Sequence, residues 1–229
     1  MILFLAVAAG ILAAGFCFWR YYWFFRDPPR TAPTEAGLLS PADGTVVYVK
    51  HVPAGSPVIV IKKGVAATVK DIAREDDGGA KIVIGIFMSP LDVHFNRAPL
   101  AARVDFIHRY PATGGSNLAM GAMHWRTLLG REPYYAGSMH IVQNERAVTR
   151  FEGEYKGTPL AAYVVQIGSF AVRGIDSYIE PGKRVERGAT FGMIRVGSQV
   201  DLIVPWREDL EPTVRPGDRV TGGETIVVR

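Results

Sequence analysis

The chain has 229 residues, of which 48% are hydrophobic and 21% are charged, and its formal net charge is +4. This length is sufficient for one domain with a hydrophobic core and a short additional segment. The basic residues are dispersed and form no stripe interleaved with aromatic residues, which argues against a nucleic-acid partner. A modest positive charge suits an anionic lipid surface instead.

The N-terminus is predicted to be a membrane anchor. Met1–Trp19 contains no charged residue and is close to the ~20 residues that an α-helix needs to cross a bilayer. Arg20, the aromatic run Tyr21–Phe25 and Arg26 follow, which is the pattern of an interfacial aromatic belt flanked by positive charge. We therefore expect residues 1–26 to be a single transmembrane anchor in the cell membrane, with the body on the cytoplasmic face.

A cleaved signal peptide is the alternative interpretation of this segment. Such a peptide has a basic stretch before its apolar run, which is missing here, and Arg20 and the aromatic residues interrupt any cleavage context. The single cysteine, Cys17, lies within the apolar run, so an intramolecular disulfide is impossible, in agreement with a reducing compartment. Residues 27–37 are rich in proline and polar residues and are expected to form a tether.

Residues 38–229 are predicted to form one mainly β domain, a sandwich or barrel-like body with few short helices. Short runs rich in β-branched residues are separated by Gly, Pro and Asp clusters, and several runs are too continuously apolar to be solvent-exposed. The expected strands are Thr45–Lys50, Val58–Lys62, Lys81–Met88, Ala102–Ile107, Ala147–Phe151, Ala161–Ile167, Phe170–Arg173, Phe191–Val196, Val200–Val204 and Thr225–Val228.

Two segments near the C-terminus resemble each other. Glu180–Ile194 and Arg215–Val228 share the pattern P-G-x-x-V-x-x-G followed by apolar residues, which predicts a turn, a short strand and a second turn in each. Similar repeats occur in biotinyl/lipoyl-type β-sandwiches, and Pro41–Val49 could supply a further strand of this kind. Two ordinary hairpins are the alternative.

Pro111–His140 differs in composition from the rest of the body. It holds three methionines and three large aromatic residues, and Ser116–Leu129 could form a short helix. Flexible thioethers and aromatic rings suit an adaptable apolar surface, such as a lid or a membrane-dipping loop. They suit a small buried helix equally well, and both interpretations are kept.

The dipeptide Gly197–Ser198 can carry unusual chemistry if it lies in a tightly held hairpin. The serine hydroxyl can attack the glycine carbonyl carbon and convert the amide into an ester. Elimination then leaves dehydroalanine, which hydrolyses to a pyruvoyl group and ammonia, and a ketone at that position is an electron sink that no ordinary side chain provides. A Gly–Ser pair alone is more often an ordinary turn, so its neighbours must decide.

Collinear motifs accompany the dipeptide along the chain. They are FFRDPPR (Phe24–Arg30), LLSPADGTV (Leu38–Val46), SPLDVHFNRAP (Ser89–Pro99), QNER (Gln143–Arg146), VQIGSFAVRGI (Val165–Ile175) and FGMIRVGSQVDLIVP (Phe191–Pro205). With these motifs in this order, the chain resembles the phosphatidylserine decarboxylases, in particular their short, membrane-tethered bacterial and archaeal form.

The resemblance implies a proenzyme that cuts itself between Gly197 and Ser198. It would give a β chain of residues 1–197 and an α chain of residues 198–229 whose first residue becomes a covalent pyruvoyl cofactor. Ser198, His94 and Asp43 would be the catalytic residues, as nucleophile, base and orienting carboxylate. The substrate would be phosphatidylserine, or its archaeal counterpart archaetidylserine, in the membrane, and the products an ethanolamine lipid and carbon dioxide.

One position departs from the longer members of the family. They carry a second histidine three residues after the first, and Arg97 stands there in this chain, so His94 is expected to serve both self-cleavage and decarboxylation. The hairpin has VGSQ where the long form has LGST, which keeps the reacting pair. Asp92, Asn96 and Arg97 are expected to support the site, although Asp92 and His94 could also be a structural pair.

The expected partners are the phospholipid substrate and the protein's own two fragments as a heterodimer, with a higher homo-oligomer left open. No metal site is expected, because the five histidines and Cys17 lack metal-ligand spacing. Three rival functions are a pyruvoyl enzyme for a soluble amino acid, a non-catalytic membrane-anchored adaptor with a lipoyl-like domain, and an inactive relative. The membrane anchor argues against the first, and the chain shows no heptad-bearing helix for the second.

Overall fold

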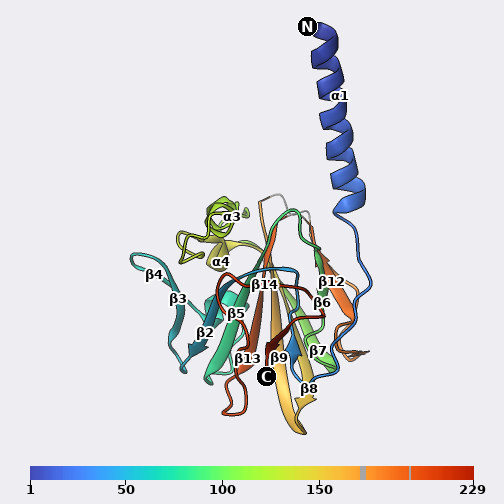
Figure 1. The fold of residues 1–229 in the computed structure, drawn as a ribbon. Coiled ribbons are helices and arrows are strands. Elements are labelled where there is room, and N and C mark those ends of the chain that lie inside the picture. Colours follow the sequence, from blue (N-terminus) through green and yellow to red (C-terminus); the bar gives the residue numbers. More distant parts are fainter. Residues whose placement is uncertain (171–173, 196) are drawn as a thin grey trace.

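The computed structural model describes residues 1–170, 174–195 and 197–229. A curled antiparallel β body carries one long N-terminal helix that stands away from it (Figure 1). The expectation of a mainly β fold with one N-terminal apolar helix is thereby confirmed.

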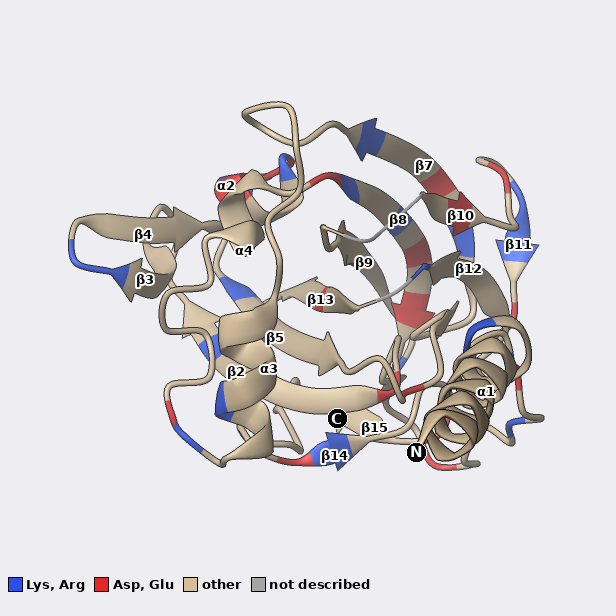
Figure 2. Ribbon diagram, turned by 90° about the horizontal axis from the view of Figure 1, so that it is seen from above, with Lys and Arg blue, Asp and Glu red and all other residues tan. Residues whose placement is uncertain are grey.

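Eight strands form the main sheet, in the order β11-β7-β8-β9-β13-β5-β2-β14, and every neighbouring pair is antiparallel. Seen from above, the sheet curls around an interior (Figure 2). In chain order these strands are β2 (Gly44–Val52), β5 (Lys81–Met88), β7 (Ala102–Tyr110), β8 (Arg146–Tyr155), β9 (Thr158–Gly168), β11 (Arg184–Val185), β13 (Ser198–Pro205) and β14 (Arg219–Val220).

Three smaller antiparallel sheets complete the body, with the orders β10-β12-β6, β1-β15 and β3-β4. Their strands are β1 (Leu38–Leu39), β3 (Pro57–Lys62), β4 (Val65–Thr68), β6 (Phe95–Arg97), β10 (Ile175–Ser177), β12 (Thr190–Ile194) and β15 (Ile226–Val228).

The described residues include four α-helices and one π-helical turn. The long helix α1 (Ile2–Phe18) continues into the turn η1 (Trp19–Trp23), and together they are long and apolar enough to cross a membrane. The short helices α2 (Val69–Ala73), α3 (Gly121–Leu128) and α4 (His140–Gln143) lie on the body.

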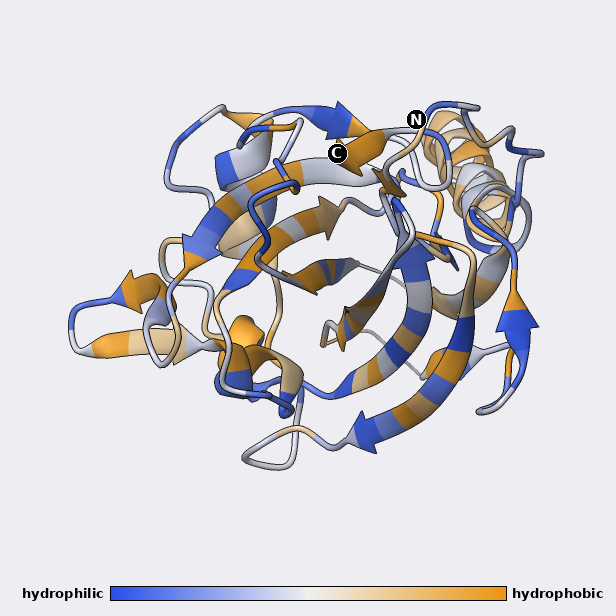
Figure 3. Ribbon diagram, turned by 90° about the horizontal axis from the view of Figure 1, so that it is seen from below, coloured by the Kyte–Doolittle hydropathy of each residue, from blue (hydrophilic) through white to orange (hydrophobic). Residues whose placement is uncertain are grey.

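Two hydrophobic clusters cover the two faces of the main sheet. On β5, Ile84 and Ile86 belong to one cluster, whereas Val83 and Phe87 belong to the other, which also receives α2, α3 and α4. All eight residues of β5 are buried, which explains why its sequence is continuously apolar after Lys81. The strands β7 and β8, which have residues on the surface, alternate between hydrophobic and hydrophilic residues instead (Figure 3).

The predicted strands largely match the observed ones. Lys81–Met88 has the observed bounds, and most other predicted strands are shorter than the observed strands by a few residues. The short strands β1, β4, β6 and β10 were not predicted. The predicted strand Phe170–Arg173 falls mainly on residues 171–173, outside the described residues, and Phe170 itself lies in a turn.

The helix predicted over Ser116–Leu129 is shorter than expected, because α3 begins only at Gly121. The residues before it are held to the body in another conformation. The Asn144 side chain accepts from the Leu118 N–H and donates to the Leu118 carbonyl, at 2.8 Å in each case. These two bonds to the Asn144 side chain take the place of the backbone hydrogen bonds that Leu118 would form in a helix.

The two similar C-terminal segments lie at opposite edges of the main sheet. Strand β11, in the first segment, pairs with β7 at one edge, and β14, in the second segment, pairs with β2 at the other edge. Each strand is preceded and followed by a turn, as the repeat predicted.

This placement is part of an internal two-fold relationship in which β7, β8 and β9 correspond to β2, β5 and β13. The Leu39 N–H donates to the Pro99 carbonyl at 2.9 Å. Its counterpart, the Arg97 N–H, donates to the Pro41 carbonyl at the same distance. Both halves also carry a register shift at the corresponding place, after Val46 in β2 and after Val104 in β7.

Candidate active site

Gly197 and Ser198 lie at the start of β13, in the connection from β12. Gly197 has a φ of +60°, in the left-handed region that costs glycine little and other residues more. Ser198 is fully buried, and its backbone is bracketed in the sheet by Met88 of β5 on one side and Gly168 of β9 on the other. The expected hairpin is not found, because β12 pairs with β6 and β10 whereas β13 pairs with β5 and β9. The dipeptide lies instead where the chain passes from one sheet to the other, and the pairing of β13 on both sides fixes Ser198.

Two buried polar atoms of the predicted site have no hydrogen-bond partner among the described residues, Ser198 Oγ and His94 Nε2. His94 directly precedes β6, and its carbonyl accepts from the N–H of Ile194, the last residue of β12, at 3.2 Å. The topology thus brings His94 beside the strand that leads into Ser198. Buried polar groups are usually paired, and ten such unpaired side-chain atoms occur in the described residues. These two are distinguished by lying on segments that the pairing of β6 with β12 brings together.

The tautomer of His94 follows from its one side-chain hydrogen bond. Its Nδ1 lies 2.9 Å from the Asp92 carbonyl oxygen, and because a carbonyl only accepts, Nδ1 carries the proton. Nε2 then has a free lone pair. Burial lowers the pKa of His94 to about 4, so the ring is neutral near pH 7 and can accept a proton at Nε2.

The Asp43 carboxylate forms its hydrogen bonds with Arg30 and Gly222 and not with His94, so it does not orient the imidazole directly. Its carboxylate accepts from Arg30 Nη2 at 2.8 Å and from the Gly222 N–H at 2.7 Å. Burial raises its pKa, while these two donors oppose the rise. Gly44 next to it must lack a Cβ, because that atom would clash with the Phe87 carbonyl oxygen. The PADG motif therefore has a structural reason for its glycine.

The three supporting residues play different structural parts. Asp92 accepts from the Ser89 N–H at 2.7 Å and pairs with Arg219, which closes the loop before His94. Asn96 accepts from Gln166 at 2.8 Å, linking β6 to β9.

Arg97 pairs with Asp27 and donates to the Gly188 carbonyl at 3.2 Å. The residue in place of the second histidine thus fastens the segment that follows the apolar helix.

Arg26 connects the end of the apolar helix with the candidate site. It donates to the Leu91 carbonyl at 2.7 Å, in the loop before His94. An arginine here places positive charge between a membrane-sized helix and the buried serine.

Comparison with known proteins gives the family. The model of the family described as phosphatidylserine decarboxylase matches residues 18–228. The chain belongs to the phosphatidylserine decarboxylase family. It is therefore a decarboxylase of phospholipid biosynthesis.

Named relatives cover most of the chain. A phosphatidylserine decarboxylase proenzyme of Symbiobacterium thermophilum is 34% identical over 228 residues, 99% of this chain and 86% of the relative. A protein of Methanopyrus kandleri, named as a proposed archaetidylserine decarboxylase proenzyme, is 37% identical over 209 residues, 90% of this chain and 80% of the relative. Its counterpart in Methanocaldococcus jannaschii is 36% identical over 206 residues, 90% of this chain and 87% of the relative.

The decarboxylase also has a buried polar network that sequence reasoning missed, beginning at the residue after Ser198. Gln199 accepts from His140 Nε2 at 3.0 Å and donates to Tyr48 Oη at 3.0 Å and to Asp201 Oδ1 at 2.8 Å. All four side chains are buried, and burial raises the pKa of Asp201 to about 7. A signal was present, since Gln199 and Asp201 are polar residues at alternate positions of an otherwise apolar strand.

The QNER motif of the decarboxylase has a structural role as well. Arg146 is 1% exposed and its guanidinium donates to four backbone carbonyls, those of Asp71, Ile72, Ile141 and Asn144. These bonds fasten α2 and α4 to the start of β8.

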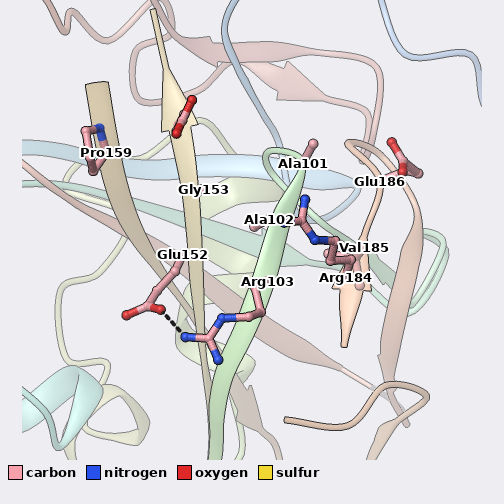
Figure 4. A pocket seen from close by; sticks show the side chains of 10 residues that line it. Ala101, Ala102, Arg103, Glu152, Gly153, Pro159, Arg184, Val185 and Glu186 are labelled. Carbon is pink, nitrogen blue, oxygen red and sulfur yellow. Dashed lines mark hydrogen bonds and ion pairs between the residues drawn. The ribbon is translucent and has the colours of Figure 1, made fainter. Parts of the chain in front are cut away.

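A separate surface pocket of about 550 Å³ lies at the opposite end of the strands from Ser198 (Figure 4). Its lining includes residues 101–103, 152–154 and 184–186, and Arg103 pairs with Glu152 across it at 2.7 Å. Within the two-fold relationship, it occupies the place that corresponds to the candidate site. There Leu160, which pairs with Gly153, corresponds to Ser198, which pairs with Met88. No group of His, Cys, Asp and Glu in the described part of the chain is arranged to hold a metal.

Proposed function

We propose that this decarboxylase is pyruvoyl-dependent, that it cuts itself between Gly197 and Ser198, and that it converts phosphatidylserine or archaetidylserine to the ethanolamine lipid and carbon dioxide. The observation that carries the proposal is the pair of buried atoms without partners, Ser198 Oγ and His94 Nε2, beside the left-handed Gly197. The names of the relatives support both the lipid substrate and the proenzyme form.

Self-cleavage needs a nucleophile, a base and a reacting carbonyl. His94 Nε2 takes the Ser198 hydroxyl proton, and Oγ attacks the Gly197 carbonyl carbon, so that a C–O bond forms and the C–N bond breaks. Loss of the Ser198 α-proton then breaks the Cβ–O bond, which frees the Gly197 carboxylate and leaves dehydroalanine. One water molecule hydrolyses this residue to the pyruvoyl group and releases ammonia.

The residues around Ser198 fit such a group. Ser198 sits between β5 and β9, so the new α chain stays hydrogen-bonded to the β chain on both sides after the cut. A pyruvoyl group at this position would supply an electron sink for the electron pair that is released when carbon dioxide leaves. His94, neutral and free at Nε2, can hold and return the proton that decarboxylation requires. The buried setting excludes water from these transfers.

We further propose that residues 1–26 anchor the enzyme in the membrane, that residues 38–229 form the catalytic domain on the cytoplasmic face, and that the two fragments remain together as a heterodimer. The proposed tether, residues 27–37, is fastened to the body rather than loose. Arg30 pairs with Asp43, and Arg187 donates to the Pro33 carbonyl at 2.8 Å. The anchor is thus coupled directly to the residues around the site.

The deciding experiment is the intact mass of the detergent-solubilised protein beside two variants. The parent chain is expected to give two fragments split at Gly197–Ser198. The smaller fragment should be lighter, by the mass of one ammonia molecule, than a peptide that starts with serine. Ser198→Ala should remain whole. Ser169→Ala is the matched control, because this neighbouring serine lies about 3.8 Å from the place of a Cβ on Gly197 and should not affect the cut. An uncut parent chain under active conditions would overturn the proposal.

A further inference from the structure

Helix α3 presents an apolar face to the outside. Trp125, Leu128 and Leu129 are 60%, 64% and 56% exposed, whereas Met123 is fully buried beneath the helix. The exposed residues follow a helical spacing of three and four, so they lie on one side. A helix that directs its largest apolar side chains away from the core has a face that another apolar phase must cover.

This face lies at the same end of the body as Ser198. Tyr110 at the end of β7 pairs with Arg146 at the start of β8, and Arg146 pairs in turn with Ile167 of β9. Gly168, the next residue of β9, pairs with Ser198. The whole segment between β7 and β8, including α3, therefore projects from the end of the sheet that holds the serine.

The candidate membrane span also leaves the body at this end. Trp19 Nε1 donates to the Pro90 carbonyl at 3.2 Å, and the next fully buried residue, Phe24, packs against His94. In the side view, α3 and the lower end of α1 lie at the same end of the body (Figure 1). In the view from above, they lie apart from each other across that end (Figure 2). A bilayer crossed by α1 would therefore begin at the level of α3.

Two further exposed side chains join α3 at this end. Leu91, in the loop after β5, is 67% exposed, and Phe170, just after β9, is 73% exposed. Together with the three exposed residues of α3 they form what we call the apolar rim, Leu91, Trp125, Leu128, Leu129 and Phe170.

We propose that the apolar rim inserts into the bilayer interface, so that α3 is a second membrane contact beside the anchor α1. The inference rests on the proposed function and extends it. With contacts on both sides of Ser198, the site would face the bilayer directly, and a lipid headgroup could enter without leaving the membrane surface.

The direct test places a fluorescent label on α3 in a full-length chain that carries Cys17→Ala. An environment-sensitive dye is attached to Leu128→Cys, or to the control Thr158→Cys, which is exposed at the opposite end of β9. The proteins are reconstituted into nanodiscs of phosphatidylcholine and phosphatidylserine with a nitroxide on the acyl chain. The label at 128 should shift to the blue and be quenched, whereas the label at 158 should show neither change.

Two results would overturn the inference. Equal, water-like emission at both positions would mean that α3 stays in solvent. A blue shift at 128 in detergent as well, without nitroxide quenching, would identify a second copy of the chain as the occupant. The labelling is repeated with Ser198→Ala, so that loss of activity and loss of membrane contact can be told apart.

A functional test uses Leu128→Ser with Leu129→Ser. Decarboxylation of long-chain phosphatidylserine in vesicles should fall by about tenfold in kcat/KM, because less apolar area enters the interface. Self-cleavage and the turnover of a short-chain, water-soluble phosphatidylserine should not change. An equal loss on both substrates would assign α3 a purely structural role.

Discussion

The rings of Phe24 and His94 lie 4.4 Å apart, and both residues are fully buried. The last part of the membrane-proximal segment therefore covers the proposed base. This contact helps to keep water from the imidazole, and burial is the main reason why its pKa is lowered to about 4. The segment that follows the apolar helix thus also forms one side of the candidate site.

The low pKa of His94 predicts an unusual pH dependence of self-cleavage. The base works in its neutral form, which at pH 5 is roughly nine-tenths of the molecules for a pKa of about 4. The cleavage rate of freshly synthesised chain should therefore stay level from pH 8 to about pH 5 and fall only toward pH 4. Phe24→Ala should raise the pKa and move this fall toward pH 6.5, whereas Phe25→Ala, at a partly exposed ring, should not. A fall near pH 6.5 in the parent chain would contradict a shielded base.

Removal of the imidazole should abolish processing rather than folding. His94→Ala is expected to slow self-cleavage by at least ~100-fold, the usual contribution of a general base. His51→Ala is the control, because His51 is exposed and stacks on Trp206. Gel analysis of the cut and circular dichroism of the same samples separate the two effects. If His94→Ala cleaves itself as fast as the parent chain, this residue is excluded as the base.

The Arg30–Asp43 pair allows a test of how Asp43 acts. Asp43→Asn should slow self-cleavage, and Arg30→Ala should destabilise the fold by about 1–3 kcal/mol, since it removes a charged hydrogen bond from a largely buried carboxylate. Cleavage rates of both single variants and the double variant form a cycle. If Asp43 contributes only through Arg30, the double variant will be no slower than the slower single variant. Additive losses would assign Asp43 a separate part in the reaction.

Gln199 should stabilise the start of β13 after the cut. Gln199→Leu leaves the His140 Nε2–H and the Tyr48 hydroxyl without their partner, at a cost of about 1–3 kcal/mol for each buried group. Thermal unfolding should therefore occur at a lower temperature. Adding His140→Leu should recover part of the loss, because both members of one pair are then apolar. No recovery would indicate that Gln199 acts mainly through Tyr48 and Asp201.

The sequence was sufficient to predict a strand where the local residue pattern agrees with the burial of that strand. Lys81–Met88 was predicted with its observed bounds, because a strand buried on both faces has a continuous apolar run, here Ile82–Met88. β1 and β6 were missed because they have only two and three residues, and their pairing partners lie far away in the chain. A strand that short has no periodicity to detect.

For the site, the sequence predicted the residue types but not the contacts between them. The motif containing Asp92 and His94 indicated a pair, yet the hydrogen bond uses the Asp92 backbone carbonyl, while its carboxylate pairs with Arg219. Only the path of the loop after β5 decides which oxygen faces the ring. Asp43 likewise meets Arg30, a partner set by how the segment after the anchor returns to the body.

The two-fold relationship within the sheet has a consequence for the scissile bond. Counting along the paired strands from Leu160 and Ser198, Gly197 corresponds to Pro159. Proline fixes a negative φ, whereas Gly197 has a φ of +60°, so the two halves cannot share one backbone conformation at this peptide. The molecule thus contains, at Pro159–Leu160 in β9, a counterpart of the proposed cleavage site that lacks both the glycine and the serine. The departure from symmetry falls on the bond that is proposed to break.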